Sequence, residues 1–371
     1  MNIKRAGSFT ALLAAGALVL TGCATNESDE PTTPAEPGAE APAGLSGTLV
    51  GAGASSIGAA MEGWIAEFQT ANPDVTVNYD PSGSGAGRET FAGGGSAFAG
   101  SDRAFRTTEL EEITFEACAP DSGIVQLPVY ISPIAVIFNV DGIESLNMDA
   151  DTIAGIFAGE ITNWNDEAIA SQNEGVDLPD LRITPVNRSD SSGTTENFVD
   201  YLAQAAPSVW TFDVSGDWPT ELAAGEAAQG TSGVVDAVTN GTGTIGYADA
   251  SRAGGLGQVS VLVGDTYVPF SPEAAAAVVD DSELQEGRAD FDLTFDLNRN
   301  TADSGAYPIV LVAYLITCET FADSAQAELT QAFLRYVASD AGQANAAENA
   351  GSAPISATLS GQVNAAIDVI S

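Results

Sequence analysis

The sequence predicts an α/β fold, and three observations support this prediction. From Leu45 onward, runs with the alternation of β-strands are followed by runs with the spacing of α-helices, a pattern typical of largely parallel sheets. Glycine-rich segments stand at several strand-to-helix junctions. Two long apolar segments, residues 127–140, which we expect to be broken at Pro133, and residues 307–316, indicate a chain that leaves one lobe, builds a second and returns.

Composition excludes several classes of function. The chain has 371 residues, of which 44% are hydrophobic, enough for two ordinary domains with buried cores. There are 51 acidic and 11 basic residues, and the resulting net charge of −40 disfavours nucleic acid and anionic lipid as partners. The chain contains no histidine, which excludes Ser-His-Asp and Cys-His hydrolysis and histidine-ligated zinc. Its three cysteines lie far apart and cannot form a zinc site alone.

The N-terminus predicts export and lipidation. Lys4 and Arg5 precede an apolar run at residues 11–20, which is too short to span a bilayer and is typical of a signal peptide. The small residues before Cys23 resemble a bacterial lipobox, so we expect residues 1–22 to be removed and the Cys23 thiol to be lipidated. An ordinary secretory signal that happens to end near a cysteine is the alternative. Cleavage would remove two cations and change the net charge from −40 to −42.

Residues 23–44 are expected to form the lipidated cysteine and a solvated tether. The segment is rich in Pro, Ala, Thr and Glu and has almost no apolar side chain to bury. We therefore expect the globular part to begin at Leu45.

The pattern of apolar residues predicts the elements in order. A strand at residues 47–53 is followed by a helix with apolar residues at positions 57, 61, 64, 65 and 68, for which Ser55 or Ser56 is the expected N-cap. A strand at residues 75–79, a short helix and a short strand ending near Asp102 come next. The strongest later elements lie at residues 125–140, 153–157, 183–186, 195–206, 244–248, 308–316 and 322–338.

Two glycine-rich junctions are candidate anion sites. The first is Gly-Ala-Gly-Ala-Ser-Ser at residues 51–56, where the start of a helix offers unpaired N–H groups and a partial positive charge. The second is Ser-Gly-Ser-Gly-Ala-Gly-Arg at residues 82–88, whose glycines let the backbone approach an oxyanion closely. This second segment lacks the Gly-Lys-Ser/Thr ending of a P-loop, which disfavours nucleotide. A plain N-cap and a flexible turn are the structural alternatives.

Two further segments complete the set. Gly-Ser-Asp at residues 100–102 places a carboxylate beside the anion sites, which makes sense if the anion carries a proton; a simple turn is the alternative. Residues 188–198 place an arginine, several hydroxyls and a glycine at the start of an apolar-periodic helix. A capping box of Ser192 or Thr194 with Glu196 is compatible with anion binding there.

In this order, the four segments resemble the phosphate-binding protein of the bacterial high-affinity phosphate ABC importer, the PstS family. Residues 156–165, with Phe-x-Gly-x-Ile-x-x-Trp, and residues 243–247, Gly-Thr-Ile-Gly-Tyr, also resemble that family. The resemblance implies a periplasmic-binding-protein-like fold of type II, in which a hinge joins two lobes, each a mixed sheet flanked by helices. The lobes are expected at residues 45–132 with 303–371, and at residues 133–302.

The resemblance also implies the ligand residues of one phosphate buried between the lobes. They are Ser55, Ser56, Ser84 and Asp102 from the first lobe, and Arg188, Ser192, Gly193 and Thr194 from the second. The family's usual Gly-Ala-Gly-Ala-Thr-Phe is here Gly-Ala-Gly-Ala-Ser-Ser, so we expect position 56 to contribute mainly its N–H. Arg103 and Arg106 follow Asp102 closely and could either steady its carboxylate or lie on the surface, and we expect the surface.

Cys118 and Cys318 remain after lipidation of Cys23, and an even pair in an exported protein favours a disulfide. Two buried free thiols are the alternative. A disulfide would join residue 118 to the returning C-terminal segment, as expected if both belong to one discontinuous lobe.

We therefore expect a monomeric lipoprotein on the outer face of the cell membrane that captures inorganic phosphate and passes it to an ABC permease. It would need no cofactor or metal and would catalyse no reaction. A receptor for another tetrahedral oxyanion, such as sulfate or molybdate, is one alternative. A phosphate-ester hydrolase with Ser192 or Asp102 as nucleophile is another, disfavoured because neither a histidine nor a tight acidic cluster is present.

Overall fold

The structure is a computed structural model that describes residues 44–222, 225–303 and 305–371. The predicted signal peptide, Cys23 and all of the predicted tether except Gly44 lie outside these residues. No helix within the described ranges is long and apolar enough to cross a membrane.

One sheet of 11 strands organises the described part of the chain, in the order β2-β1-β3-β13-β4-β8-β6-β7, with β9 pairing with β4, β5 and β10 beside this path. Its strands are β1 (Gly47–Gly53), β2 (Val75–Asp80), β3 (Phe98–Ser101), β4 (Ile124–Asn139), β5 (Ser145–Met148), β6 (Thr184–Arg188), β7 (Glu226–Ala228), β8 (Thr244–Asp249), β9 (Gly257–Val263), β10 (Thr266–Val268) and β13 (Val310–Cys318). A separate pair consists of β11 (Glu283–Leu284) and β12 (Phe295–Asp296).

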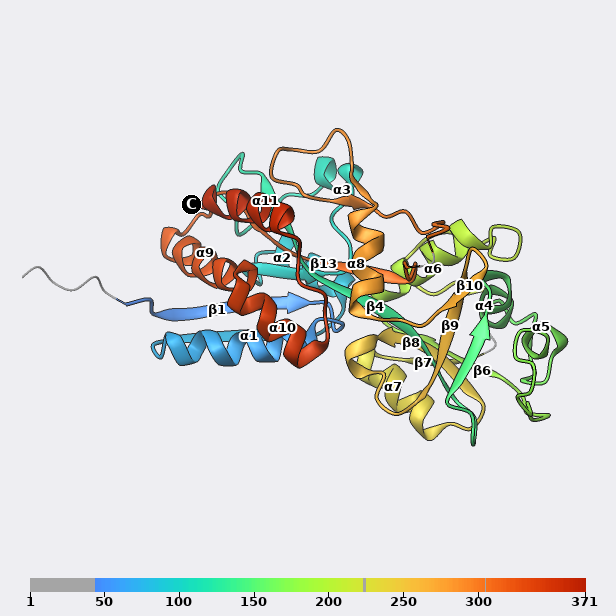
Figure 1. The fold of residues 1–371 in the computed structure, drawn as a ribbon. Coiled ribbons are helices and arrows are strands. Elements are labelled where there is room, and N and C mark those ends of the chain that lie inside the picture. The colour runs from blue at the N-terminus through green and yellow to red at the C-terminus, as the bar shows by residue number, and fades with distance from the viewer. Residues whose placement is uncertain (1–43, 223–224, 304) are drawn as a thin grey trace, which may run out of the picture. The chain divides into compact units, whose positions relative to one another are not determined.

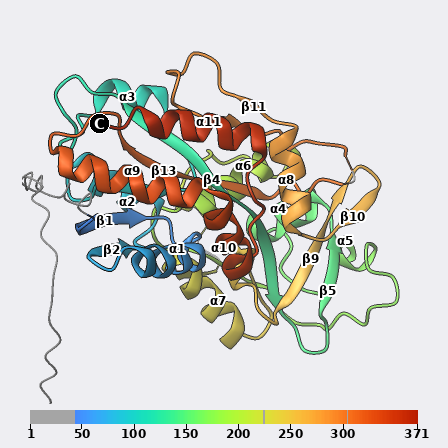
Figure 2. The same ribbon diagram turned by 60° about the vertical axis from the view of Figure 1, so that its left-hand side comes forward.

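We call the part built on β2, β1, β3 and β13 the first lobe, and the part built on β8, β6, β7, β9, β5 and β10 the second lobe. The helices of the first lobe are α1 (Gly58–Ala71), α2 (Ser84–Ala92), α3 (Thr107–Glu112), α9 (Ser324–Ala338), α10 (Asp340–Ala350) and α11 (Ala357–Asp368). Those of the second lobe are α4 (Ala150–Phe157), α5 (Glu167–Ala170), α6 (Gly193–Ala205), α7 (Gly230–Asn240), the 3-10 helix η1 (Ala250–Arg252) and α8 (Pro272–Asp280). Figure 2 shows α9 and α11 side by side, with α10 next to α9 and α1.

The fold class is confirmed, but the expectation of largely parallel sheets is wrong. Within each lobe the strand-helix units are parallel, as in the β1–β2 and β6–β8 pairs. The centre is antiparallel, because β13 runs against both β3 and β4, and β4 runs against β8. The reason is the double crossing: the chain passes out of the first lobe along β4 and returns to it along β13 in the opposite direction.

Strand β4 joins the lobes. It pairs with β13 from Ile124 to Pro133, and with β8 from Ile134 to Asn139. The strand is therefore continuous through Pro133, and the break expected there does not occur. What changes at the proline is the neighbouring strand. Figure 1 shows β4 extending from beside β13 toward β8 and β9. Every residue of the strand except the last is buried, so the crossing is part of the core.

The lobe boundaries at 132/133 and 302/303 stay a prediction. The exchange of partners on β4 lies at the first of them. Before the second, residues 292–295 touch the first lobe: Leu293 N–H donates to Gln126 O at 3.2 Å, and Phe295 N–H donates to the Tyr314 hydroxyl at 3.0 Å. We propose that the chain rejoins the first lobe in stages, and that this return begins before residue 302.

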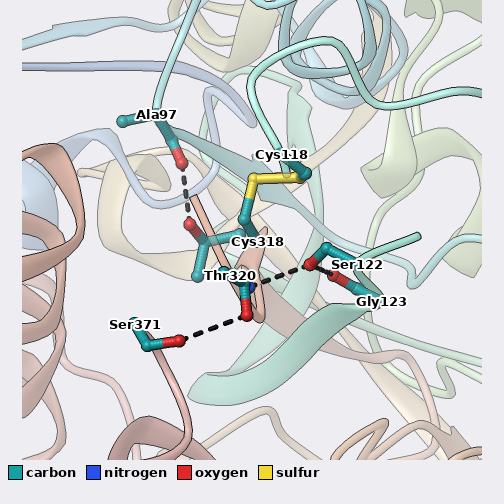
Figure 3. Close-up of a disulfide and its surroundings, with 8 residues drawn as sticks. Ala97, Cys118, Ser122, Gly123, Cys318, Thr320 and Ser371 are labelled. Atoms are coloured by element: carbon teal, nitrogen blue, oxygen red, sulfur yellow. Dashed lines mark hydrogen bonds between the residues drawn. A yellow bond between two sulfur atoms is a disulfide. The ribbon is translucent and has the colours of Figure 1, made fainter. Parts of the chain in front are cut away.

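The predicted disulfide between Cys118 and Cys318 is present, with its Cα atoms 5.3 Å apart (Figure 3). Cys318 ends β13 and is fully buried, while Cys118 lies in the loop that follows α3. Around the bridge, Thr320 N–H donates to Ser122 Oγ at 2.9 Å, and the hydroxyls of Thr320 and Ser371 lie 3.2 Å apart. The bond therefore joins the outgoing and the returning segments of the first lobe.

Removing this bond should destabilise the protein. The bond closes a loop with a sequence separation of 200. By the chain-entropy model this constraint on the unfolded chain contributes roughly 5 kcal/mol. We expect Cys118→Ala/Cys318→Ala to lower the free energy of unfolding by up to that amount in urea denaturation. The wild-type protein in reductant is the matched control, because it loses the bond and keeps the side chains. Equal stability of the oxidised and reduced forms would contradict the prediction.

A candidate anion site at the seam between the lobes

The serines after β1 are not used to cap α1. The helix begins at Gly58 with Ile57 as N-cap and no side-chain cap bond, so the expected Ser55 or Ser56 cap is wrong. Ser55 Oγ instead accepts hydrogen bonds from Arg188 Nη2 and from Thr231 N, each at 3.1 Å. Ser56 Oγ donates to Asp102 Oδ1 at 2.5 Å. Both hydroxyls therefore point away from their own helix and toward other elements of the site.

The second glycine-rich segment packs against its neighbours with no room for side chains. Gly83, the N-cap of α2, has φ 107°, a conformation that favours glycine. The N–H of Gly85 donates to Ser191 O in the second lobe at 3.0 Å. A Cβ on Gly85 would lie 2.5 Å from the Ser191 side chain. Ser84 opens the helix, is 1% exposed, and accepts a hydrogen bond from the Asp102 N–H at 3.2 Å.

Asp102 follows β3 directly and is the group on which the site converges. Its side chain is 3% exposed, and it accepts hydrogen bonds from Ser56 at Oδ1 and from Thr194 at Oδ2, the latter at 2.9 Å. Its backbone oxygen accepts from Asn197 Nδ2 at 2.7 Å. Burial raises the pKa of this carboxyl, and the two hydroxyl donors together with the charges of Arg188 and Arg88 oppose that rise.

Arg188 ends β6 and extends from the second lobe toward the first. Its guanidinium is held by Asp190, with Nε 2.8 Å from Oδ1 and Nη2 2.5 Å from Oδ2. Asp190 also accepts from the Gly230 N–H at 2.9 Å, at the start of α7. Burial favours a higher pKa for Asp190, but the hydrogen bonds and charge of Arg188 outweigh it and lower the pKa. The arginine is therefore fixed in place and 3% exposed, with Ser55 at its tip.

The start of α6 faces Asp102. Ser192 is the N-cap and accepts from Thr195 N at 3.2 Å, while Thr194 Oγ1 donates to Asp102. A Cβ on Gly193 would lie 2.6 Å from both Asp102 Cβ and Ser84 Oγ, so only glycine allows the lobes to meet this closely. The expected capping box with Glu196 does not form, because Ser192 is the N-cap and the third helical position is therefore Thr195. The Glu196 carboxylate instead binds arginines of the first lobe.

Comparison with known proteins decides the family. Residues 38–341 match the model of a PBP superfamily domain. The chain is 32% identical over 376 residues to the phosphate-binding protein PstS 3 of Mycobacterium tuberculosis, with 100% of both chains covered. It is 30% identical to the phosphate-binding protein PstS of Xylella fastidiosa, with 91% of each chain covered.

The chain belongs to the PstS family.

A solved structure supports the fold. The phosphate-binding protein from Stenotrophomonas maltophilia superposes with a TM-score of 0.66 at 19% identity, covering 86% of this chain and 94% of that one. Such a likeness shows that the two-lobe architecture is shared.

The structure brings all eight residues carried over from the PstS motifs to the seam between the lobes. Ser55 meets Arg188, while Ser56, Ser84 and Thr194 bond to Asp102. Gly193 packs on Asp102, and Ser192 caps the helix that carries it. Their assignment as phosphate ligands stays a prediction. It requires that these residues lie close together.

Sequence reasoning missed Thr231. It lies at the start of α7, is 2% exposed, and bonds to Ser55 through its N–H and at 3.1 Å through its hydroxyl. A signal was present, because Gln-Gly-Thr-Ser at residues 229–232 repeats the arrangement of glycine and hydroxyls at a strand-to-helix junction. The preceding strand, β7, has only three residues and gives no apolar pattern. Asn197 was missed as well, since an amide inside a helix has no distinguishing motif.

Arg103 and Arg106 differ in their environment. Arg106 has a side chain that is 52% exposed, as expected, but the expectation of a surface position for Arg103 is wrong, because its side chain is 16% exposed. Arg103 binds Glu109 with two bonds at 2.6 and 2.7 Å and reaches Glu196 of the second lobe at 2.8 Å. Arg106 reaches the same Glu196 carboxylate at 2.5 Å. These two ion pairs join the lobes beside Asp102.

The two stretches that resemble the PstS family, residues 156–165 and 243–247, contact the elements that carry the site. Phe157 packs edge-on against Phe198 of α6 at 4.9 Å, and Trp164 Nε1 donates to Gly243 O at 3.1 Å. Tyr247 stacks on Phe198 at 4.3 Å. Its hydroxyl lies 2.8 Å from Thr195 Oγ1 and accepts from the Arg188 N–H at 3.3 Å. These residues fix the relative position of Arg188 and the start of α6.

In the described part of the chain, no group of three or more Cys, Asp or Glu side chains could hold a metal ion. The groups that meet at the seam are hydroxyls, backbone N–H groups, Arg188 with its partner Asp190, and the buried carboxyl of Asp102.

Tyr247→Phe should destabilise the protein. The variant keeps the stacked ring and removes only the buried hydroxyl. The Arg188 N–H then loses that acceptor. An unsatisfied buried donor costs about 1–3 kcal/mol, and we expect that loss in the free energy of unfolding measured with urea. Tyr267→Phe is the matched control, since its hydroxyl bonds to Gln172 in a partly exposed position that water can enter. Equal losses in the two variants would contradict the role assigned to Tyr247.

Proposed function

We propose that the seam between the lobes binds inorganic phosphate, and that the protein is an extracytoplasmic receptor that passes phosphate to the transmembrane subunits of an ABC permease. One observation carries the proposal: Asp102 is buried between donors of both lobes, with Arg188 fixed beside it. The two relatives compared above are phosphate-binding proteins, which supports the proposal.

The donors suit a tetrahedral oxyanion. The first N–H groups of α2 and α6 have no partner within their own helices, and the partial positive charge at each helix start favours an anion. Ser55 and Ser84 add hydroxyls, Thr194 adds its backbone N–H because its hydroxyl donates to Asp102, and Arg188 adds a charged donor. Bonds from these groups to a dianion are charge-assisted and roughly twice as strong as neutral ones. Because the lobes meet closely at Gly193, closure would exclude water from the site.

Asp102 supplies selectivity in this proposal. Phosphate carries at least one proton at neutral pH, and a carboxylate accepts a hydrogen bond from it. Fully ionised sulfate offers no such proton, so two acceptors would face each other in a dry site. The assignment to phosphate over sulfate or molybdate therefore rests on Asp102 being ionised when it meets the anion.

No bond need be broken for this function, and the hydrolase alternative gains no support. Ser192 Oγ accepts the N–H of Thr195 as a helix cap, and the side-chain donors on the Asp102 carboxylate are two hydroxyls. Among the described residues, Ser192 Oγ has no hydrogen bond to a carboxylate or amine that could act as its general base. We propose that the protein is a receptor without catalytic activity, without a cofactor, and that it acts as a monomer.

We propose further that Cys23 is lipidated and anchors the receptor to the outer face of the cell membrane. The support for this comes from the sequence, namely the basic start, the apolar run and the small residues before the cysteine. The Pro- and Glu-rich residues that follow would then act as a solvated tether.

Asp102→Asn should bind sulfate more tightly. One unmade hydrogen bond costs about 1–3 kcal/mol, and ~1.4 kcal/mol is a factor of ten in affinity. An amide offers an N–H to sulfate, so we expect the phosphate-to-sulfate affinity ratio to fall by one to two orders of magnitude in calorimetry with phosphate, sulfate and molybdate. Asp151→Asn, on the surface of α4, removes the same charge and is the matched control. Absence of phosphate binding by the wild-type protein would refute the function, and an unchanged ratio in the variant would refute the role of Asp102.

Cys23→Ala should release the protein from the membrane and leave phosphate affinity unchanged. The change removes the only thiol at the expected cleavage site and none of the residues at the seam. We would measure membrane and soluble fractions together with incorporation of labelled palmitate. Retention of the variant on the membrane would contradict the lipid anchor.

A further inference from the structure

Among the residues that the structure describes, the Ser56 side chain has one hydrogen-bond partner. It is 1% exposed and donates to Asp102 Oδ1 at 2.5 Å. It does not cap α1, whose N-cap is Ile57. A hydroxyl has one proton to donate, and here that proton is given to the carboxylate. Any contact of residue 56 with an anion is then left to its backbone N–H.

Several charged and titratable groups act on Asp102 from the elements around it. Arg188 of β6 and Arg88 of α2 favour its ionised form. Tyr79 of β2 and Asp249 of β8 also interact electrostatically with Asp102, and burial raises the pKa of both. Burial of Asp102 itself favours the neutral acid. The two hydroxyl donors, Ser56 and Thr194, are the groups in direct contact that counter this burial.

The two hydroxyls belong to different lobes. Thr194 lies at the start of α6, so its bond to Asp102 depends on closure of the lobes. Ser56 lies in the same lobe as Asp102, between β1 and α1, so its bond does not depend on closure. Before an anion is enclosed, Ser56 is therefore the hydroxyl that remains on the carboxylate.

We propose that Ser56 is a positioning residue for selectivity, whose hydroxyl holds the Asp102 carboxylate and keeps it a hydrogen-bond acceptor when the anion enters. The inference rests on the proposed function and assigns the Ser56 side chain to Asp102 and not to the ligand. A hydrogen bond to the ionised form favours that form, so loss of the hydroxyl favours protonation. A neutral Asp102 would donate to any oxyanion, and discrimination between protonated phosphate and fully ionised sulfate would weaken.

Sulfate affinity should depend on pH through the protonation of Asp102. In both wild type and Ser56→Ala, sulfate should bind better as the pH falls and Asp102 becomes protonated. Because the variant lacks one donor to the carboxylate, its Asp102 should titrate at a higher pH, by about one unit. At a pH above both midpoints, sulfate affinity should then be up to about tenfold higher in the variant than in the wild type, and the ratio should fall toward one as the pH drops below them.

The experiment compares the full chain as wild type, Ser56→Ala and Ser56→Thr. The carboxyl carbon of Asp102 is followed by NMR over pH in the ligand-free protein, with assignment from Asp102→Asn, and sulfate and phosphate affinities are measured by calorimetry over the same range. Ser56→Thr keeps the hydroxyl and should follow the wild type. If Ser56→Ala does not fold, Ser56→Cys replaces it, since the weak thiol donor should give a shift of the same sign.

Two outcomes separate this inference from the proposed function. An Asp102 midpoint that is unchanged in the hydroxyl-free variant overturns the role of Ser56, whatever the anion affinities are. Absence of phosphate binding by the wild type overturns the function, while the titration of Asp102 still decides whether Ser56 holds the carboxylate. An equal loss of phosphate affinity in Ser56→Ala at every pH, with no shift of the midpoint, would assign the hydroxyl to the ligand.

Discussion

The contact between Asp102 and the start of α6 is the constraint on which the rest of the site depends. Thr194 reaches the Asp102 carboxylate, Asn197 holds its backbone oxygen, and Gly193 leaves no space for a Cβ between the lobes. The other close contacts, including the Gly85 N–H on Ser191 O, require the same approach. Strand β4 makes this approach possible, because it changes partners at Pro133 and joins the two lobes through the buried centre of the sheet.

A strongly acidic protein that holds an anion must rely on short-range groups. The net charge of −40 repels phosphate at long range, but the Debye length is about 8 Å at physiological salt, so a buried ligand senses mainly its immediate neighbours. Helix starts, hydroxyls and Arg188 supply the positive potential there. The ion pairs of Arg103 and Arg106 with Glu196 are not among these groups. They join the first lobe to the second.

Much of the site could be predicted from sequence because its residues lie in contiguous motifs with glycines, as at residues 82–88 and 188–194. Apart from the disulfide, which the count of cysteines indicated, the contacts of the site with partners distant in sequence were not predicted. The expected N-cap at Ser55 or Ser56 and the expected capping box with Glu196 follow local rules, and neither forms. Ser55 and Glu196 instead contact the other lobe, and Ser56 contacts Asp102, 46 residues away in its own lobe. Thr231 was missed because it follows a strand too short to give a periodic pattern, and its partner Ser55 is 176 residues away. Arg103 was misplaced because an isolated polar side chain carries no periodic signal, and its partner Glu196 is 93 residues away.

The disulfide also determines how the molecule would respond to force. Residues 119–317, which include the whole second lobe, lie inside the loop that Cys118 and Cys318 close, and both residue 44 and the C-terminus lie outside it. Tension applied between the two ends of the chain would pass through the sulfur–sulfur bond and bypass the inserted lobe. Pulling could then unravel α9 to α11 and β1, but the second lobe and its half of the site would stay unloaded until the bond is reduced.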